Sequence, residues 1–286
     1  MNPYLRLSIS VLAVAGLMSA DVTYSQTTKY EGGALIDMMQ KMASMPMMGK
    51  MMGSSRQAFE DQSYDIYIKG NKMARWGKLT STIYDLDADS ITNINNAKKT
   101  YTTTTFEEMQ QRMEQAQQRS KQQQGPAFDF DVKVTNTGQT RMIDGVQAKE
   151  VVITMTAKQA NAQGQMVVTT HSWLIPYSAA SQEAVDFHRK LGAKYAFVLS
   201  GGPGMAGAGK GMSAAINEAY KQEDGFPALM EMEITGVSAP GPMGGGGDPN
   251  TPLLKELIQT SNFAKGSVDD SKFSVPAGFK EDTKGR

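Results

Sequence analysis

The sequence lacks several features on which exported or catalytic proteins often depend. It contains no cysteine, which excludes disulfides, thiolate metal sites and cysteine nucleophiles. Its two histidines, His171 and His188, are too few for a three-histidine zinc site and lack the H-E-x-x-H spacing. The 29 basic and 29 acidic residues balance, so no long-range attraction draws the chain to nucleic acid or anionic membranes. We therefore expect no cofactor, no nucleic-acid partner and a fold that depends on its apolar core.

Long apolar runs are missing beyond the N-terminus. The opening, MNPYLRLSISVLAVAGLMSA, carries one positive charge at Arg6 before an uncharged stretch that is too short for a comfortable membrane span. This pattern is typical of a secretory signal peptide. We expect residues 1–25 to hold the signal, with cleavage after Ala20 or Ser25. Residues 26–286 should then form one domain, periplasmic or secreted, soluble and without stable membrane insertion; the sequence leaves its oligomeric state open.

A glycine-rich segment, residues 200–213 (SGGPGMAGAGKGMS), resembles a phosphate-binding loop at Lys210. The hydroxyl residue that would hold magnesium is replaced by Gly211. A nucleophile-elbow interpretation also fails, because the second glycine of that motif is Ala215. We interpret this segment, like residues 241–252, as a loop, and expect that the protein is not an enzyme.

Strand patterns dominate the rest of the chain. Residues 57–105 alternate apolar and polar side chains between turn-forming clusters, with Tyr64, Ile66 and Ile68 on one face, which predicts an antiparallel meander. A capping box at Thr105 to Glu108 opens a polar, surface-lying helix.

After this helix, strand patterns resume with strict period-two alternation from Phe128 to Val134. Asp144-Gly145 predicts a tight turn before a long strand through Ile153, which the segment GQMVVTTHSWLIP follows as its antiparallel partner. A helix is expected at 181–191 and a strand at 227–237, while residues 253–263 together with KFSVPAGFK should close the sheet. The predicted fold class is α+β: a large curled antiparallel sheet, an incomplete β-barrel, with helices covering its concave face.

Several segments occur in the order and spacing of a known family. They are YIKGNKMA, TIYDLDADSITNINNAKKTYTTTTFEEM, NTGQTRMIDGVQAKEVVITMT, GFPALMEMEI and FSVPAGF. From about Tyr64 to Phe279 the chain resembles periplasmic proteins of the lipoprotein-localisation-factor (LolA) type, most of all an exported branch classed as a domain of unknown function. The resemblance implies a half-barrel whose helix-covered apolar cavity receives lipid acyl chains. The arginine that controls lid opening in those carriers has no assigned counterpart, and the Met-rich and Gly-rich segments have none in the carriers.

The segment DMMQKMASMPMMGKMMG is unusually rich in methionine. Methionine is unbranched and polarizable, so such a cluster can form an adaptable apolar lid over a ligand. Thioethers also select Cu(I), which gives a second interpretation as a copper site, and a third is ordinary packing on the sheet. The lid interpretation takes these residues: Met38, Met39, Met42, Met45, Met47, Met48, Met51 and Met52. The copper interpretation takes these: Met38, Met42, Met45, Met48 and Met51.

Other candidate residues give weaker signals. Trp76 and Trp173 could line the cavity, although a half-buried tryptophan is common in sheets. Asp85 to Asp89 starts like a calcium loop but lacks the later glycine and glutamate, so a solvated turn is expected. The two histidines are expected to be structural. Together these observations predict a non-enzymatic envelope protein that binds or carries an apolar ligand, a lipid or a lipidated protein, with Cu(I) binding as the alternative.

Overall fold

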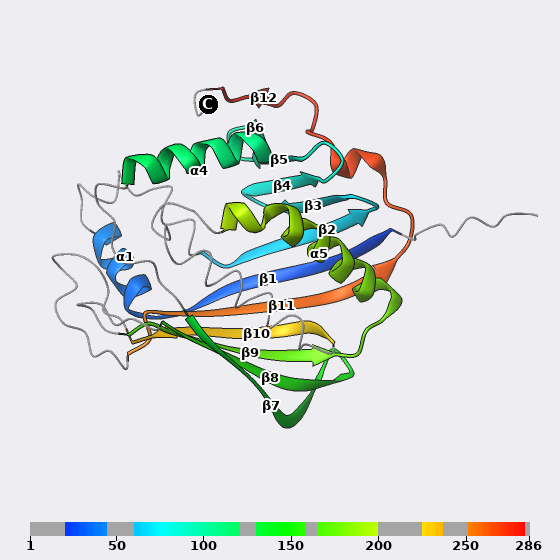
Figure 1. The fold of residues 1–286 in the computed structure, drawn as a ribbon. Coiled ribbons are helices and arrows are strands. Elements are labelled where there is room, and N and C mark those ends of the chain that lie inside the picture. The colour runs from blue at the N-terminus through cyan, green and yellow to red at the C-terminus, as the bar shows by residue number, and fades with distance from the viewer. Residues whose placement is uncertain are drawn as a thin grey trace, which may run out of the picture.

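The structure is a computed structural model that describes residues 21–44, 60–120, 130–157, 165–199, 225–236 and 251–283. Within these ranges the chain forms one sheet of twelve strands (Figure 1). The strands are β1 (Val22–Gly32), β2 (Gln62–Lys69), β3 (Lys72–Gly77), β4 (Thr80–Asp85), β5 (Ser90–Asn95), β6 (Thr100–Thr105), β7 (Phe130–Ile143), β8 (Val146–Ala157), β9 (Val167–Ile175), β10 (Phe226–Thr235), β11 (Leu254–Lys265) and β12 (Lys280–Glu281).

Two local meanders make up most of this sheet. Its order is β12-β6-β5-β4-β3-β2-β1-β11-β10-β9-β8-β7, so β2 to β6 form one run of sequential neighbours and β7 to β10 form another. β1 and β11 pair with each other and join the two meanders. Every pairing is antiparallel except the short parallel contact of β12 with β6. The predicted antiparallel sheet is therefore confirmed, and in the described residues it is open, with β7 and β12 at its ends.

The turn between β7 and β8 shows why the sequence favours hairpins. Asp144 and Gly145 have φ values of 48° and 78°, and Ile143 pairs directly with Val146. Two consecutive positive φ values give a tight turn whose twist matches that of the flanking strands, and Asp-Gly is the preferred sequence for it. The tight turn predicted here is confirmed.

The described residues form three α-helices: α1 (Ala34–Ser44), α4 (Phe106–Ser120) and α5 (Ala179–Leu199). The capping box at the start of α4 is confirmed, because Glu108 N donates to Thr105 Oγ1 at 3.1 Å and Thr105 N donates to a Glu108 carboxylate oxygen at 3.0 Å. The helix expected at 181–191 is longer than its apolar spacing indicated. No helix in the described part of the chain has the length and apolar character needed to cross a membrane.

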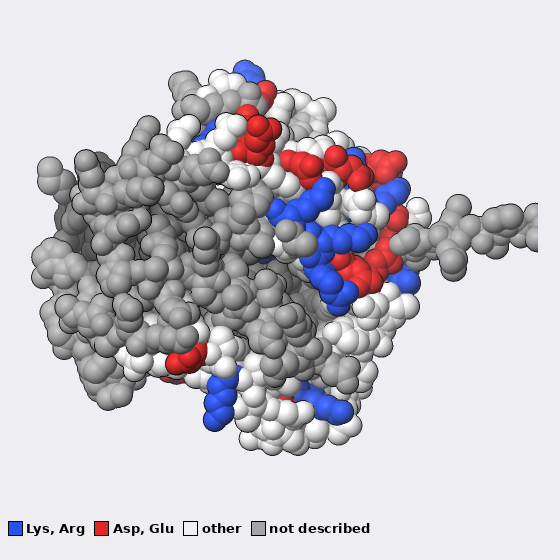
Figure 2. All heavy atoms as spheres, viewed as in Figure 1, with Lys and Arg blue, Asp and Glu red and all other residues white. Residues whose placement is uncertain are grey.

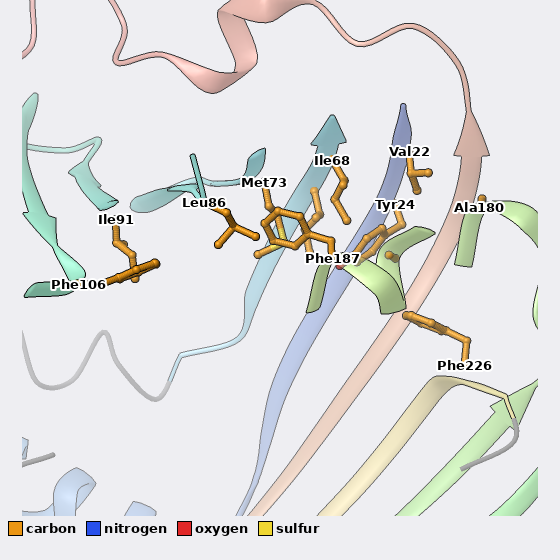
Figure 3. Packing of buried hydrophobic residues seen from close by; sticks show 12 residues of the cluster. Val22, Tyr24, Ile68, Met73, Leu86, Ile91, Phe106, Ala180, Phe187 and Phe226 are labelled. Atoms are coloured by element: carbon orange, nitrogen blue, oxygen red, sulfur yellow. The ribbon is translucent and has the colours of Figure 1, made fainter. Parts of the chain in front are cut away.

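α5 packs against one face of the sheet, which we call the helix-side face. Ala180, Ala184 and Phe187 of α5 contact buried residues of β1, β2 and β3 (Figure 3). Phe187 is only 2% exposed and its ring lies beside Met73 and Tyr24. We call this the α5 cluster; its buried members are Val22, Tyr24, Ile66, Ile68, Met73, Leu86, Ile91, Phe106, Ala180, Ala184, Phe187 and Phe226.

The opposite face of β3 to β6 is covered by the C-terminal segment, residues 266–283. This segment includes the 3₁₀ helix η2 (Asp270–Phe273), and its residues Phe273, Val275 and Phe279 pack on Ala74, Ile83 and Ile94. The expectation that KFSVPAGFK closes the sheet is wrong in this respect: β11 pairs in the middle of the sheet, while this later segment crosses over a face and reaches the edge only at β12. Its proline and glycine limit ladder hydrogen bonding, which explains the departure.

Candidate functional site

The helix-side face carries a second apolar cluster away from α5. Register pairs Val151 of β8 with Ser172 of β9, Ser172 with Met230 of β10, and Met230 with Ile258 of β11, which places all four on this face. The second group, which we call the β7–β10 cluster, has the buried members Phe130, Val151, Ile153, Met155, Ala157, Val168 and Leu174, and the half-buried members Val132, Val134, Met166, Met232 and Ile234. None of these members belongs to a described helix.

Polar and titratable side chains share this face with the two clusters. The register aligns Gln26 of β1 with Tyr64 of β2, and Tyr30 of β1 with Glu256 of β11. Arg75 of β3 lies opposite Ile66, a buried member of the α5 cluster. Period-two alternation therefore places Gln26, Tyr30 and Arg75 on the same side as α5.

The environment of this face favours neutral forms. Burial raises the pKa of Tyr24 well above its usual value, against the opposing effect of the Arg75 charge. Burial also raises the pKa of Tyr30, with further contributions from Glu256 and Tyr64. Burial alone raises the pKa of Glu256. Each shift has the sign expected for an acid in a medium that solvates charge poorly.

His188 of α5 combines accessibility with a dehydrated environment. Its side chain is exposed, and its Nδ1 donates to the Ala184 carbonyl oxygen at 2.7 Å. Desolvation nevertheless lowers its pKa, and the nearby positive charge of Arg75 lowers it further. The protein around His188 therefore disfavours its charged form, although part of its side chain meets solvent.

Arg75 is a basic residue within this arrangement. One of its terminal nitrogens donates to Gln26 Oε1 at 3.3 Å, and its guanidinium carbon lies 4.2 Å from the centroid of the Tyr64 ring. Its Nε is enclosed and has no hydrogen-bond partner. Both of these described contacts are neutral, so they leave the positive charge of Arg75 uncompensated.

Neither tryptophan lies on the helix-side face. Trp76 is next to Arg75 on β3 and points to the other face, where its Nε1 donates to the Lys272 carbonyl oxygen at 2.9 Å. Trp173 packs with Ile143, Ala148 and Leu229 under Arg141, whose guanidinium lies 4.4 Å from its ring. The expectation that Trp76 and Trp173 line a cavity beneath the helices is corrected on this point, since period-two alternation turns both rings away from α5.

Most of the methionine-rich segment lies outside the described residues. Met38 is in α1 and half-buried, and Met39 and Met42 belong to the same helix, although the structure does not describe their side chains. Met45, Met47, Met48, Met51 and Met52 lie outside the described residues, as do the glycine-rich segment 200–213 and residues 241–250. The lid and Cu(I) interpretations both stay predictions. In the described part of the chain, no group of three His, Cys, Asp or Glu residues could hold a metal ion.

A separate polar cluster lies on the opposite face. Glu150 of β8, 5% exposed, accepts hydrogen bonds from Thr137 Oγ1 at 2.6 Å and from His171 Nδ1 at 2.8 Å. Burial favours the protonated acid, but these two hydrogen bonds together with the charges of His171 and Arg141 outweigh it and lower the pKa of Glu150. The Asp85 carboxylate accepts from the backbone nitrogens of Asp87 and Ala88, which confirms the predicted turn.

Charges on the solvent side of α5 are mixed in sign. Figure 2 shows Lys and Arg side chains gathered beside Asp and Glu over this part of the molecule. Lys194 pairs with Asp89, and Arg189 lies 2.9 Å from Asp186. Such paired surface charges supply solubility rather than a one-sign surface for a polyanion.

Sequence reasoning missed Arg75, Tyr30, Tyr64 and Glu256 as site residues. A signal for Arg75 was present, because in Met73-Ala74-Arg75-Trp76 the charged side chain shares the strand face of Met73, which the alternation buries. The face of Glu256 depends on pairing between β1 and β11, which local periodicity does not reveal.

No protein-family model matches the chain, and no curated protein matches it.

Proposed function

We propose that the protein is an exported, non-enzymatic binder of an apolar ligand, a lipid or a lipidated protein, held on the helix-side face. The observation that carries this proposal is the β7–β10 cluster. It extends the apolar character of that face beyond the strands to which α5 packs, and it has no member in a described helix.

The half-buried members of the β7–β10 cluster provide the contact surface. Val132, Val134, Met166, Met232 and Ile234 retain accessible apolar area. Covering that area with an acyl chain is favourable by about 25 cal/mol per Å². Methionine contributes surfaces that adapt to ligands of differing shape.

The titratable groups support binding rather than catalysis. His171 contacts the Glu150 carboxylate and His188 contacts a backbone carbonyl, so neither of these described contacts pairs a histidine with a hydroxyl that it could activate. The resemblance to LolA-type carriers also favours a lipidic ligand in a helix-covered half-barrel. The N-terminal segment with the features of an export signal supports a location outside the cytoplasm. We place the protein in the periplasm or outside the cell on that basis.

Native mass spectrometry of the mature protein, purified from its own envelope, tests this function. We expect release of a mass in the lipid range. Val134→Asp should abolish that species because it puts a charge into the β7–β10 cluster, whereas Thr135→Asp, the adjacent exposed residue on the other face of β7, should retain it.

Loss of ligand from both variants, or from neither, contradicts binding at this surface. A protein that carries no ligand and instead takes up Cu(I) through residues 38–52 replaces the proposal with the copper alternative.

A further inference from the structure

The structure assigns to Arg75 the acidic headgroup of the ligand: we propose that the helix-side face binds amphipathic anions, an acyl chain ending in a carboxylate or phosphate. This inference rests on the proposed function and specifies its ligand class. Its basis is that Arg75 lies inside the helix-side face with neutral described partners and an enclosed, unpartnered Nε.

Comparison with two other arginines shows that this arrangement is unusual. Arg141 lies 3.4 Å from Glu231, and Arg189 lies 2.9 Å from Asp186, although both side chains are more than a third exposed. Solvent would stabilise those two charges even without a carboxylate. Arg75 is half-buried, where compensation matters more, yet none of the described ion pairs includes it.

The described side chains that interact with Arg75 carry no negative charge. Tyr24 has a raised pKa and stays a neutral phenol, and His188 has a lowered pKa and stays a neutral imidazole near pH 7. Burial is the main cause of both pKa shifts; the positive charge of Arg75 opposes the rise for Tyr24 and adds to the fall for His188. Gln26 offers only an amide oxygen.

A guanidinium meets carboxylate and phosphate oxygens through paired N–H donors. The stacking of Arg75 on Tyr64 holds this planar group in place, and its enclosed Nε has no hydrogen-bond partner. Tyr64, the half-buried residue of the α5 cluster that contacts Arg75, suits the first methylenes of an acyl chain. The chemistry recognised is therefore an anionic oxygen headgroup on a hydrocarbon chain, whether it comes from a free fatty acid or from a phospholipid.

The test compares three probes on the delipidated mature protein by isothermal titration calorimetry: palmitate, palmitoyl lysophosphatidate and neutral hexadecanol. We expect the wild-type protein to prefer at least one anionic probe over hexadecanol roughly tenfold, as a hydrogen-bonded ion pair in an enclosed site implies. The probe that shows the larger preference identifies the headgroup.

Arg75→Gln should remove the preference for the anionic probe while leaving hexadecanol binding intact. Arg75→Lys should retain part of the preference, because lysine keeps the positive charge but lacks the paired N–H donors of the guanidinium. Arg141→Gln is the matched control, since Arg141 also stacks on an aromatic ring, and it should keep the preference. Circular dichroism verifies folding; if Arg75→Gln does not fold, the reduced preference of Arg75→Lys decides.

An unchanged ratio of anionic to neutral affinity in the Arg75 variants overturns this inference alone. Failure of all three probes to bind overturns the proposed function as well.

Discussion

The two faces of the sheet differ in whether their surroundings favour neutral or charged forms of titratable side chains. On the helix-side face, the pKa shifts of Tyr24, Tyr30, Glu256 and His188 all favour neutral forms, and desolvation is the largest cause of each. On the opposite face, the pKa of Glu150 is lowered although burial opposes it, and the pKa of Lys69 is raised, chiefly through its hydrogen bond to Asp270. The opposite face therefore stabilises its charged groups with partners from the chain itself.

This contrast separates structural polar groups from candidate ligand-binding ones. A buried charge with an opposite charge or hydrogen-bond partners is already stabilised, whereas a half-buried charge without an opposite charge beside it costs free energy. Arg75 belongs to the second kind, and Glu150 with His171 and Thr137 belongs to the first. The predictions below test that distinction and the packing on which it depends.

The largest effect is expected from shortening β1. A protein starting at Gln26 lacks Val22 and Tyr24, which are 0% and 4% exposed, and also Asp21, whose carboxylate accepts from Val268 N at 2.8 Å. Their loss should lower the free energy of unfolding by about 5 kcal/mol relative to a protein starting at Asp21. Urea titration of the two forms measures the difference. We accordingly expect signal cleavage after Ala20, which intact-mass measurement of the exported protein checks; a mature chain starting at Gln26 would contradict it.

Phe187→Ala should detach α5 from the sheet. The ring is 2% exposed within the α5 cluster, so its removal should cost about 3–5 kcal/mol of unfolding free energy. Tyr177→Ala, at a 39% exposed aromatic, should cost less than about 0.5 kcal/mol. Denaturant titration of both variants measures the two losses of unfolding free energy. Equal losses would mean that α5 is not anchored through Phe187.

Substituting one glutamate on each face compares the two faces directly. Glu150→Gln removes a charge that accepts two hydrogen bonds and should lower the unfolding free energy at pH 7 by about 1–2 kcal/mol. Glu256→Gln removes a charge that its surroundings disfavour, so stability should be unchanged or higher. Thermal unfolding at pH 7 gives both values; a clear loss for Glu256→Gln would show that its carboxylate has a structural partner.

The smallest effect is expected from His188, in the dependence of the melting temperature on pH. The folded-state pKa of His188 lies below its ordinary value of 6.5, so the unfolded chain takes up a proton first as pH falls. The melting temperature should therefore be at its full value above pH 6.5 and decline as pH falls from 6.5 through the folded-state pKa. His188→Gln should flatten this part of the profile. An unaltered slope in His188→Gln would assign the decline to other groups.

The sequence predicted those parts of the fold that depend on local patterns. Alternation and turn chemistry defined the meander from β2 to β6, the Asp144-Gly145 turn and the capping box of α4. It did not predict how the C-terminal segment crosses the opposite face, because that path depends on the apolar pocket formed by Ala74, Ile83 and Ile94 of three different strands.

The candidate site was less accessible to sequence reasoning. The sequence pointed to Trp76 as a cavity-lining residue because it is a large aromatic. The functional candidate is instead Arg75, the preceding residue, whose side chain lies on the other face of the strand. Deciding between adjacent residues requires knowing which face α5 covers, and α5 is distant in the sequence from β3. Composition identifies unusual residues, whereas an unpartnered charge becomes visible only when its surroundings are known.

The pairing of β1 with β11 determines when the sheet can finish forming during folding. Val22 pairs with Lys265, and Asp21 accepts a hydrogen bond from Gly266, so contacts across nearly the whole chain join its two meanders. Each meander can form from local hairpins. β1, however, is synthesised before both meanders and can pair with its second neighbour only after β11 has been synthesised. A chain synthesised from its N-terminus therefore keeps one edge of β1 unpaired until β11 has been made.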